Sequence, residues 1–247
     1  MIHIFLPAYN EAVALPRVTE KFSRELAKRG DPFRFIVLDD GSSDGTARTA
    51  EELAKRFPLE LLRHPVNLGL GPTLKDGIAH LARVTADDDL VVMLDCDDTH
   101  EPEFLPAALD KIKEGYDVVL LSRFCPGGGC GDLDPFKKFL SMGAGTFLKI
   151  FFPIKGVKEY SCCYRVFRAS ILKKGVKAFG DHFIRLPHLG FVAAPEILVR
   201  MRMLGARIVE SPFTLRYDQK PGKSKHRRMK TVLGYFALAA IYFGKKT

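Results

Sequence analysis

Two aspartates separated by a single residue are the first feature of this sequence that indicates chemistry. Asp95 and Asp97 directly follow the apolar run at residues 90–94, and Asp98 adds a third acid. Carboxylates so close together repel one another. A divalent cation removes that repulsion, since Mg²⁺ is commonly held by one or two carboxylates plus the phosphate oxygens of a substrate. The alternative is a solvated acidic turn, which is the simpler interpretation of this pair taken alone.

Two other polar clusters also come directly after apolar runs that we predict to be buried strands. Residues 2–6 lead into the segment 7–11, and residues 33–38 lead into Asp39 and Asp40. The run at residues 90–94 is continuous rather than alternating, which is typical of a strand covered on both faces. Open parallel sheets bind their ligands beyond the carboxyl ends of the strands. We therefore expect the three clusters to share one site.

Helical patterns alternate with these strands along the chain. The alternation, with its short connections, predicts an α/β fold in which helices cover both faces of a mostly parallel sheet. With 247 residues, 47% of them hydrophobic, the chain fits one such domain over residues 1–228, followed by a basic and apolar helix over residues 229–247. We expect helices at residues 13–30, 44–56, 73–84 and 193–204, and further strands at residues 59–62, 90–94, 116–121, 160–167 and 207–215.

The charge balance is strongly basic and points to anionic partners. A formal net charge of +9 suits phosphorylated substrates, an anionic membrane face or nucleic acid. The sequence contains no recognised nucleic-acid reader motif, so we expect no nucleic acid as a partner. The five cysteines lack the paired spacing of a zinc site. Residues 1–6 predict a strand rather than a cleavable leader, and both observations favour a cytoplasmic protein with reduced thiols.

Two apolar segments in the second half raise the question of a membrane. Residues 216–230 carry seven Lys or Arg residues and run into the apolar residues 232–243. That apolar run has twelve residues, whereas a helix that spans a bilayer needs about 20. Basic residues beside a short apolar helix suit the surface of an anionic leaflet, and a solvated basic face is the alternative. Residues 135–152 are equally consistent with a core helix and with a helix at the mouth of the site that meets a lipid.

Four of these segments together resemble the family 2 glycosyltransferases of the GT-A type. They are Pro7-Ala8-Tyr9-Asn10-Glu11, the acidic turn at residues 39–46, Asn67-Leu68-Gly69 and Asp95-Cys96-Asp97. Within that family, the chain is most similar to the dolichol-phosphate mannosyltransferase and polyprenyl-phosphate glycosyltransferase branch. The narrower resemblance rests on Ser122-Arg123-Phe124, Gly127-Gly128, Tyr164-Arg165, Glu196-Ile197-Leu198, Glu210-Ser211-Pro212 and Gly222-Lys223-Ser224-Lys225.

The resemblance implies a GT-A fold and a role for each matching residue. The residues expected to bind the nucleotide sugar are Pro7, Ala8, Tyr9, Glu11, Asp39, Asp40, Asn67 and Lys225. Of these, Asp40, together with Asp39, would hydrogen-bond the base. Asp95 and Asp97 would hold Mg²⁺ or Mn²⁺ on the donor diphosphate, and relatives often add a Gln where this chain has Thr99. The residues expected at the acceptor phosphate are Arg123, Lys137 and Ser141, and the expected catalytic residues are Asp95, Asp97 and Arg123.

The resemblance also implies a reaction. A hexose, with mannose favoured, would pass with inversion from a nucleotide sugar of the GDP-mannose or UDP-glucose type to a polyprenyl or dolichyl phosphate. A phosphate monoester has a second pKa of about 6, so at pH 7 it is already an anionic nucleophile and needs no general base. The protein would then lie peripherally on the cytoplasmic face of a membrane.

Two alternatives to this reaction stay open. A saccharide or other hydroxyl acceptor would need a general base, for which Asp132 and Asp134 are the candidates. They follow the glycine-rich residues 127–131, which suit either a mobile lid or a plain flexible turn. The second alternative is a non-catalytic nucleotide- or membrane-binding module on the same fold.

Overall fold

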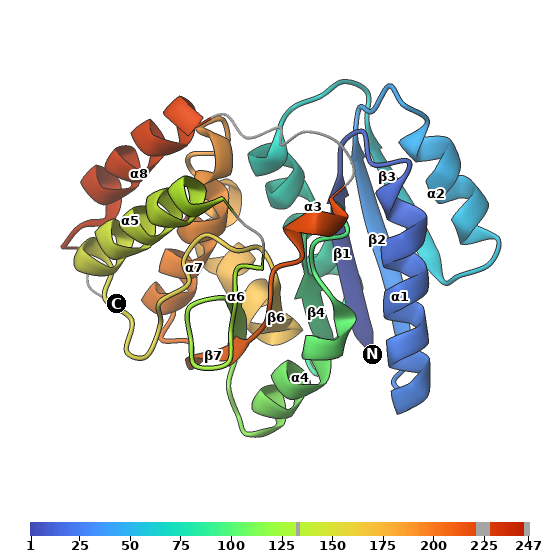
Figure 1. Ribbon diagram of the computed structural model, residues 1–247, viewed down its shortest axis with the longest axis horizontal. Coiled ribbons are helices and arrows are strands. Elements are labelled where there is room, and N and C mark those ends of the chain that lie inside the picture. Colours follow the sequence, from blue (N-terminus) through green and yellow to red (C-terminus); the bar gives the residue numbers. More distant parts are fainter. Residues whose placement is uncertain (132–133, 221–227, 245–247) are drawn as a thin grey trace.

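The structure is a computed structural model that describes residues 1–131, 134–220 and 228–244, without the side chains of residues 135–137 and 228. Within these ranges, seven strands form one sheet, and helices cover both of its faces (Figure 1). In chain order the strands are β1 (Ile2–Ala8), β2 (Phe33–Asp40), β3 (Leu59–His64), β4 (Leu90–Met93), β5 (Val118–Ser122), β6 (Arg165–Arg168) and β7 (Ile208–Pro212).

The order of the strands shows where a ligand can bind. Across the sheet the order is β3-β2-β1-β4-β6-β5-β7. Strand β1 pairs in parallel with β2 on one side and with β4 on the other, so the order of connection reverses at β1. Open α/β sheets leave a crevice at such a point, beyond the carboxyl ends of the strands. The three polar clusters follow β1, β2 and β4, and they therefore lie at this edge.

One strand runs against its neighbours. Strand β6 pairs antiparallel with β4 and with β5, while the other pairs are parallel, which confirms the mostly parallel sheet. The strand predicted at residues 160–167 is shorter, since β6 covers only Arg165–Arg168, although the Tyr164 carbonyl before it still accepts the Leu121 N–H of β5 at 3.0 Å. The strand predicted at residues 207–215 ends at Pro212, where its partner β5 also ends, at Ser122.

The helices connect the strands much as the sequence predicts. They are α1 (Ala14–Arg29), α2 (Thr46–Ala54), α3 (Leu70–Val84), α4 (Leu105–Lys113), α5 (Pro135–Phe151), α6 (Ala169–Phe179), α7 (Ala193–Met203) and α8 (Arg228–Tyr242), with short 3₁₀ turns η1 (Pro102–Phe104), η2 (Gly180–His182), η3 (Gly190–Val192) and η4 (Tyr217–Gln219). Helix α1 ends at Gly30, whose φ of 71° is left-handed, as expected for the residue after a helix. Helix α6 was not predicted, although its apolar residues recur with helical spacing.

The hydrophobic core forms two layers, one on each face of the sheet. Helices α1, α2 and α4 cover one face, and helices α3, α6, α7 and α8 cover the other. Side chains of β1 alternate between them, with Ile4 and Leu6 in the first layer and Phe5 in the second. Gly77 lets α3 approach the sheet closely, because a Cβ at this position would lie 2.0 Å from the Phe5 ring.

The C-terminal helix α8 belongs to this core. Its inner face buries Tyr235, Leu238 and Tyr242. The Tyr242 hydroxyl donates a 2.6 Å hydrogen bond to the buried carboxylate of Glu196 in α7. Helix α8 lies beside α5 (Figure 1), and the rings of Phe147 and Phe236 meet at 5.1 Å between their centroids. In the described part of the chain, no helix is both long enough and apolar enough to cross a membrane.

Candidate active site

Two loops that hydrogen-bond to each other form the first wall of the site. The backbone N–H of Asn10, after β1, donates to the Ser42 hydroxyl at 2.8 Å, and the N–H of Glu11 donates to the Thr46 hydroxyl at 2.8 Å. Asn10 has a φ of 53°, a left-handed conformation that Asn tolerates better than most residues. The loops after β1 and β2 are thereby held side by side. Of the predicted nucleotide-binding residues, Pro7 and Ala8 end β1, and Tyr9 and Glu11 lie in the loop that follows it.

The carboxylate of Asp40 accepts hydrogen bonds from neighbouring groups of the protein itself. The carboxylate accepts the backbone N–H groups of Leu68 and Gly69 at 2.9 and 2.8 Å, and His64 Nδ1 lies 2.8 Å away. The amide of Asn67 donates to it at 3.0 Å. Asp40 and Asn67 were both predicted to contact the nucleotide. The structure brings them to each other, where they shape the turn that leads into α3.

Asp39 is placed differently from its neighbour. Its Oδ1 accepts the backbone N–H of Ser42 at 3.1 Å. Its Oδ2 is buried without a hydrogen-bond partner among the residues that the structure describes, and Arg63 Nε lies 3.8 Å from it. A buried acceptor without a hydrogen bond costs about 1–3 kcal/mol, so this oxygen is ready to accept an N–H group of a ligand. Of the two aspartates predicted to hydrogen-bond a base, Asp39 is therefore the one with a carboxylate oxygen that has no hydrogen-bond partner within the described residues.

The carboxylates of Asp95 and Asp97 lie beyond the end of β4, as predicted. Asp97 is 12% exposed; its Oδ1 accepts the Thr99 hydroxyl at 2.6 Å, and its Oδ2 is bonded to the ammonium of Lys220. Burial raises the pKa of Asp95, and the neighbouring charge of Asp97 adds to that effect although His100 opposes it. Burial also disfavours the charged form of Asp97, but Lys220 and His100 outweigh burial and lower its pKa.

The two carboxylates suit a divalent cation. Carboxylate oxygens are hard donors, and Mg²⁺ is usually held by one or two of them, with phosphate oxygens and water completing its shell. The cation that Asp97 already binds, the ammonium of Lys220, shows that this position stabilises positive charge. Within the described ranges, no group of three or more His, Cys, Asp or Glu side chains could hold a metal ion. The predicted ligands Asp95 and Asp97 are thus a pair of carboxylates, and phosphate oxygens and water would complete the shell of a metal ion bound to them. Thr99, at the position of the expected third ligand, instead orients Asp97.

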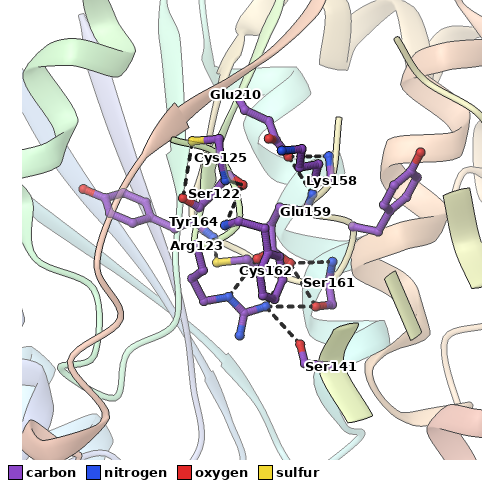
Figure 2. A network of polar contacts seen from close by, with 12 residues as sticks. Ser122, Arg123, Cys125, Ser141, Lys158, Glu159, Ser161, Cys162, Tyr164 and Glu210 are labelled. Atoms are coloured by element: carbon purple, nitrogen blue, oxygen red, sulfur yellow. Dashed lines mark hydrogen bonds and ion pairs between the residues drawn. The ribbon is translucent and has the colours of Figure 1, made fainter. Parts of the chain in front are cut away.

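A second charged centre follows β5. Arg123 donates from Nε and Nη2 to the carboxylate of Glu159 at 2.7 and 2.9 Å (Figure 2). Its Nη2 also lies 3.3 Å from the hydroxyls of Ser141 and Ser161. Arg123 and Ser141, both predicted at the acceptor phosphate, are thus brought together. Glu159 was not among the predicted site residues, and its only signal in the sequence is an acid directly before the strand predicted at residues 160–167.

Glu159 is itself held firmly in place. It is 1% exposed and accepts the backbone N–H groups of Ser161 and Cys162 at 3.2 and 3.1 Å. Its own backbone N–H donates to Glu210 at 2.6 Å. Burial alone would raise the pKa of Glu159, but the charge and hydrogen bonds of Arg123 lower it. The carboxylate is therefore ionised, and it fixes the guanidinium in one orientation.

His100 connects the two charged centres. Its ring is buried and stacks on Tyr164, with 5.1 Å between the ring centroids. Its Nδ1 accepts the backbone N–H of Asp95 at 3.3 Å, and its Nε2 lies 3.7 Å from the sulfur of Cys162. Since the Cys162 N–H donates to Glu159, a short chain of contacts joins the Asp95 turn to the Arg123 pair. Both centres thus face the same edge of the sheet.

An apolar cavity opens next to Arg123. Its volume is about 350 Å³, and its lining residues are Phe124, Met142, Gly145, Thr146, Lys149 and Lys158. Of the other predicted site residues, Asp134 is exposed just before α5. Lys225, Asp132 and the side chain of Lys137 lie outside the described residues.

Comparison with known proteins shows the family to which this chain belongs. Residues 3–176 match glycosyl transferase family 2, and the chain belongs to that family. It is 29% identical over 236 residues to the dolichol-phosphate mannosyltransferase of Pyrococcus furiosus, covering 95% of this chain and 61% of that protein. It is 28% identical over 222 residues to a dolichyl-phosphate β-glucosyltransferase of Trichomonas vaginalis, covering 85% and 64%. The chain therefore spans less than two thirds of each relative.

Solved structures share the fold. A mannosyltransferase from Pyrobaculum calidifontis in complex with GDP-Man and Mn²⁺ aligns with a TM-score of 0.60 at 18% identity, covering 100% of this chain and 65% of that chain. The glucosyl-3-phosphoglycerate synthase of Mycobacterium tuberculosis in complex with Mg²⁺ and UDP aligns with a TM-score of 0.63 at 17% identity, covering 97% and 79%. At these identities the likeness shows a common architecture, and it confirms the predicted fold.

Proposed function

We propose that this family 2 glycosyltransferase moves a hexose, with mannose favoured, from a nucleotide sugar to a polyprenyl phosphate. One observation carries the proposal: Arg123, fixed by Glu159 and close to Ser141, lies at the same sheet edge as Asp95 and Asp97. A guanidinium that is already oriented suits an acceptor phosphate, because an N–H group of Arg that Glu159 does not engage can donate a charge-assisted hydrogen bond to a phosphate oxygen. The two dolichyl-phosphate relatives support the same class of acceptor.

The acceptor requires little further chemistry from the protein. Glu159 engages Nε and Nη2 of Arg123, while the other terminal nitrogen points away from these partners (Figure 2). A phosphate bound there is already an anionic nucleophile near pH 7. Arg123 and Ser141 then need only to hold and orient it. The apolar cavity beside Phe124 and Met142 is suited to the first carbons of a prenyl chain.

The donor side needs charge neutralisation. A Mg²⁺ or Mn²⁺ ion held by Asp95 and Asp97 would act as a Lewis acid on the leaving nucleoside diphosphate. The chain's own residues complete the donor site: Asp39 Oδ2 accepts an N–H group of the base, and the Thr99 hydroxyl keeps Asp97 oriented. Attack from the acceptor side, opposite the diphosphate, gives inversion at the anomeric carbon.

We also propose that the outer faces of α5 and α8 lie on a membrane surface. Each helix carries an exposed apolar stripe with helical spacing. The exposed residues are Phe139, Leu140, Met142 and Ile150 on α5, and Met229, Val232, Leu233 and Phe236 on α8, with Phe243 directly after α8. The stripes adjoin through ring contacts, since Phe151 and Phe243 lie 5.3 Å apart between their centroids. Apolar side chains set among lysines are typical of helices that lie in the interface of a bilayer.

The membrane proposal is tested best by surface substitutions. Deleting residues 231–247 would also remove the buried side chains Tyr235 and Leu238 and would disturb the core. The double variant M229S/L233S changes only exposed positions, which are 77% and 59% exposed. We expect it to lose binding to vesicles that contain anionic lipid and to keep the melting temperature of the wild type. Unchanged vesicle binding by a folded variant would contradict the proposal.

The sugar transfer is tested with a panel of donors. GDP-mannose, UDP-glucose and other nucleotide sugars are offered with a polyprenyl phosphate and Mn²⁺ or Mg²⁺, and labelled lipid is measured. We expect product with the phosphate and none with the matching polyprenol, because Arg123 requires an anionic acceptor. Transfer to the free alcohol, or to a soluble saccharide but no lipid, would overturn the proposed acceptor. Asp97→Ala is expected to abolish transfer.

A further inference from the structure

The segment after β7 lies across the loop that carries Asp97. We call residues 216–220 the strap; its centre is η4, the short orange-red helix in the middle of Figure 1. The backbone N–H of Arg216 donates to the carbonyl of Thr99 at 3.0 Å. At its other end, the side-chain amide oxygen Oε1 of Gln219 accepts a 2.6 Å hydrogen bond from Lys21 of α1.

Lys21 ties the strap to the metal-binding loop. Its ammonium lies 2.9 Å from Asp98 Oδ1 and 2.8 Å from Glu101 Oε1, in addition to its bond with Gln219. Asp98 has a φ of 62°, a left-handed conformation that Asp tolerates better than most residues. The same lysine thus contacts both the loop after β4 and the strap.

The strap places Lys220 directly on Asp97. The ammonium of Lys220 is bonded to Asp97 Oδ2, and the two side chains are 16% and 12% exposed. Asp97 Oδ1 accepts the Thr99 hydroxyl, so both oxygens of this carboxylate have a partner within the protein. Asp95 and Glu11 add negative charge around the ammonium. The lysine thus occupies the position where a divalent cation would meet Asp97.

We propose that Lys220 competes with the divalent cation for Asp97, so that the strap disfavours metal binding unless a nucleoside diphosphate enters with the metal. The inference rests on the proposed function, because it assumes that Asp97 is a metal ligand. An ammonium and a metal ion cannot both occupy the same side of one carboxylate oxygen. Lys220 must therefore leave Asp97 when a metal binds there.

A diphosphate makes this exchange easier. Its negative charge gives the displaced ammonium a new partner, and the strap need only release Gln219 and the Thr99 carbonyl for Lys220 to reach it. Metal and nucleotide should consequently bind with positive coupling, each raising the affinity for the other by the same factor. A metal ion alone obtains no such compensation and has to compete with the lysine.

The test is binding of Mn²⁺ in the absence of nucleotide, measured from the electron paramagnetic resonance signal of free Mn²⁺. If the Asp97 carboxylate is released from Lys220 for about a tenth of the time, the apparent affinity of the wild type is reduced about tenfold. We expect K220M to bind Mn²⁺ about tenfold more tightly than the wild type. K113M, which removes an exposed lysine on α4, should bind as the wild type does.

Two further measurements distinguish a failure of the proposed competition by Lys220 from a failure of the proposed metal site at Asp97. GDP or UDP should increase the Mn²⁺ affinity of the wild type by a larger factor than that of K220M. Mn²⁺ binding by K220M that is equal to or weaker than that of the wild type would overturn the competition. If D97N binds Mn²⁺ as tightly as the wild type, the proposed metal site fails instead. If K220M does not fold, K220Q replaces it in the same measurement. K21M, which removes the hydrogen bond to Gln219, should also increase the affinity for Mn²⁺.

Discussion

Replacing Glu159 by Gln tests the placement of the acceptor arginine. The carboxylate accepts hydrogen bonds from Arg123, from the Ser161 and Cys162 backbone and from the Ser161 hydroxyl. An amide keeps the shape of the side chain but loses the charge. In addition, its NH₂ group must face N–H or O–H donors whichever way it is turned. The substitution therefore weakens the support of the guanidinium from inside the protein.

The magnitude follows from burial. Glu159 is 1% exposed, and the side chain of Arg123 is 9% exposed, so the pair is shielded from solvent. Removing one partner of a buried pair costs about 3–5 kcal/mol, and we expect a loss of unfolding free energy near the lower end because the amide keeps some hydrogen bonds. For the acceptor, the loss of an oriented guanidinium should reduce kcat/KM about 10- to 100-fold, which is about 1.4–2.8 kcal/mol.

The pH dependence of the unfolding free energy is a second test of the pair between Glu159 and Arg123. The pKa of Glu159 is lowered from its ordinary value of 4.5, because Arg123 outweighs the effect of burial. The folded state therefore binds fewer protons than the unfolded state at this site. The stability contributed by the pair is fully present above pH 4.5 and is lost as the pH falls through the lowered pKa. The unfolding free energy of Glu159→Gln should consequently change less with pH in the acid range.

The assay is labelled lipid formation, with donor and acceptor varied separately. We expect Glu159→Gln to impair kcat/KM for the polyprenyl phosphate while the KM for the nucleotide sugar stays within about twofold, because the donor residues are not touched. Glu159→Asp, which keeps the charge on a shorter side chain, should recover part of the loss. Glu103→Gln, an exposed acid in η1, is the matched control. Equal impairment toward both substrates, or none, would refute the positioning role.

Three other substitutions probe the remaining structure. Asp39→Asn changes the carboxylate whose Oδ2 lacks a hydrogen-bond partner within the described residues. We expect this variant to raise the KM of the nucleotide sugar about tenfold, close to 1.4 kcal/mol. An unchanged KM would exclude Asp39 from base binding. Tyr242→Phe removes the 2.6 Å hydrogen bond to Glu196 and should cost about 1–3 kcal/mol of unfolding free energy, measured by denaturant titration; no loss would argue that α8 is not held by this contact. Gly77→Ala places a methyl group 2.0 Å from the Phe5 ring and should lower the free energy of unfolding by about 1–3 kcal/mol through overpacking. A stable, active variant would contradict the close approach of α3 to the sheet.

Local pattern was sufficient to predict most of the architecture. The mainly apolar runs that became β1, β2 and β4, at residues 2–6, 33–38 and 90–94, have five or six residues each, and each leads directly into acids or a proline-containing segment. Such runs specify a buried strand by themselves. Because parallel strands end at one edge, the sequence also predicted that Asp39, Asp95 and Asp97 meet there. The antiparallel direction of β6 was not predictable, since four residues specify a strand but not the direction of its partner.

The partners of the charged residues were decided only by the tertiary structure. Arg123 meets Glu159 across 36 positions in the chain, and Lys220 meets Asp97 across 123 positions. The period and spacing of a sequence describe neighbours within one element, whereas these pairs form because separate strands end at the same edge. The same reason separates Asp39 from Asp40, which are adjacent in sequence and point to different surroundings at the end of β2. The sequence thus determined where the acids lie, and the fold determined which of them the protein already uses.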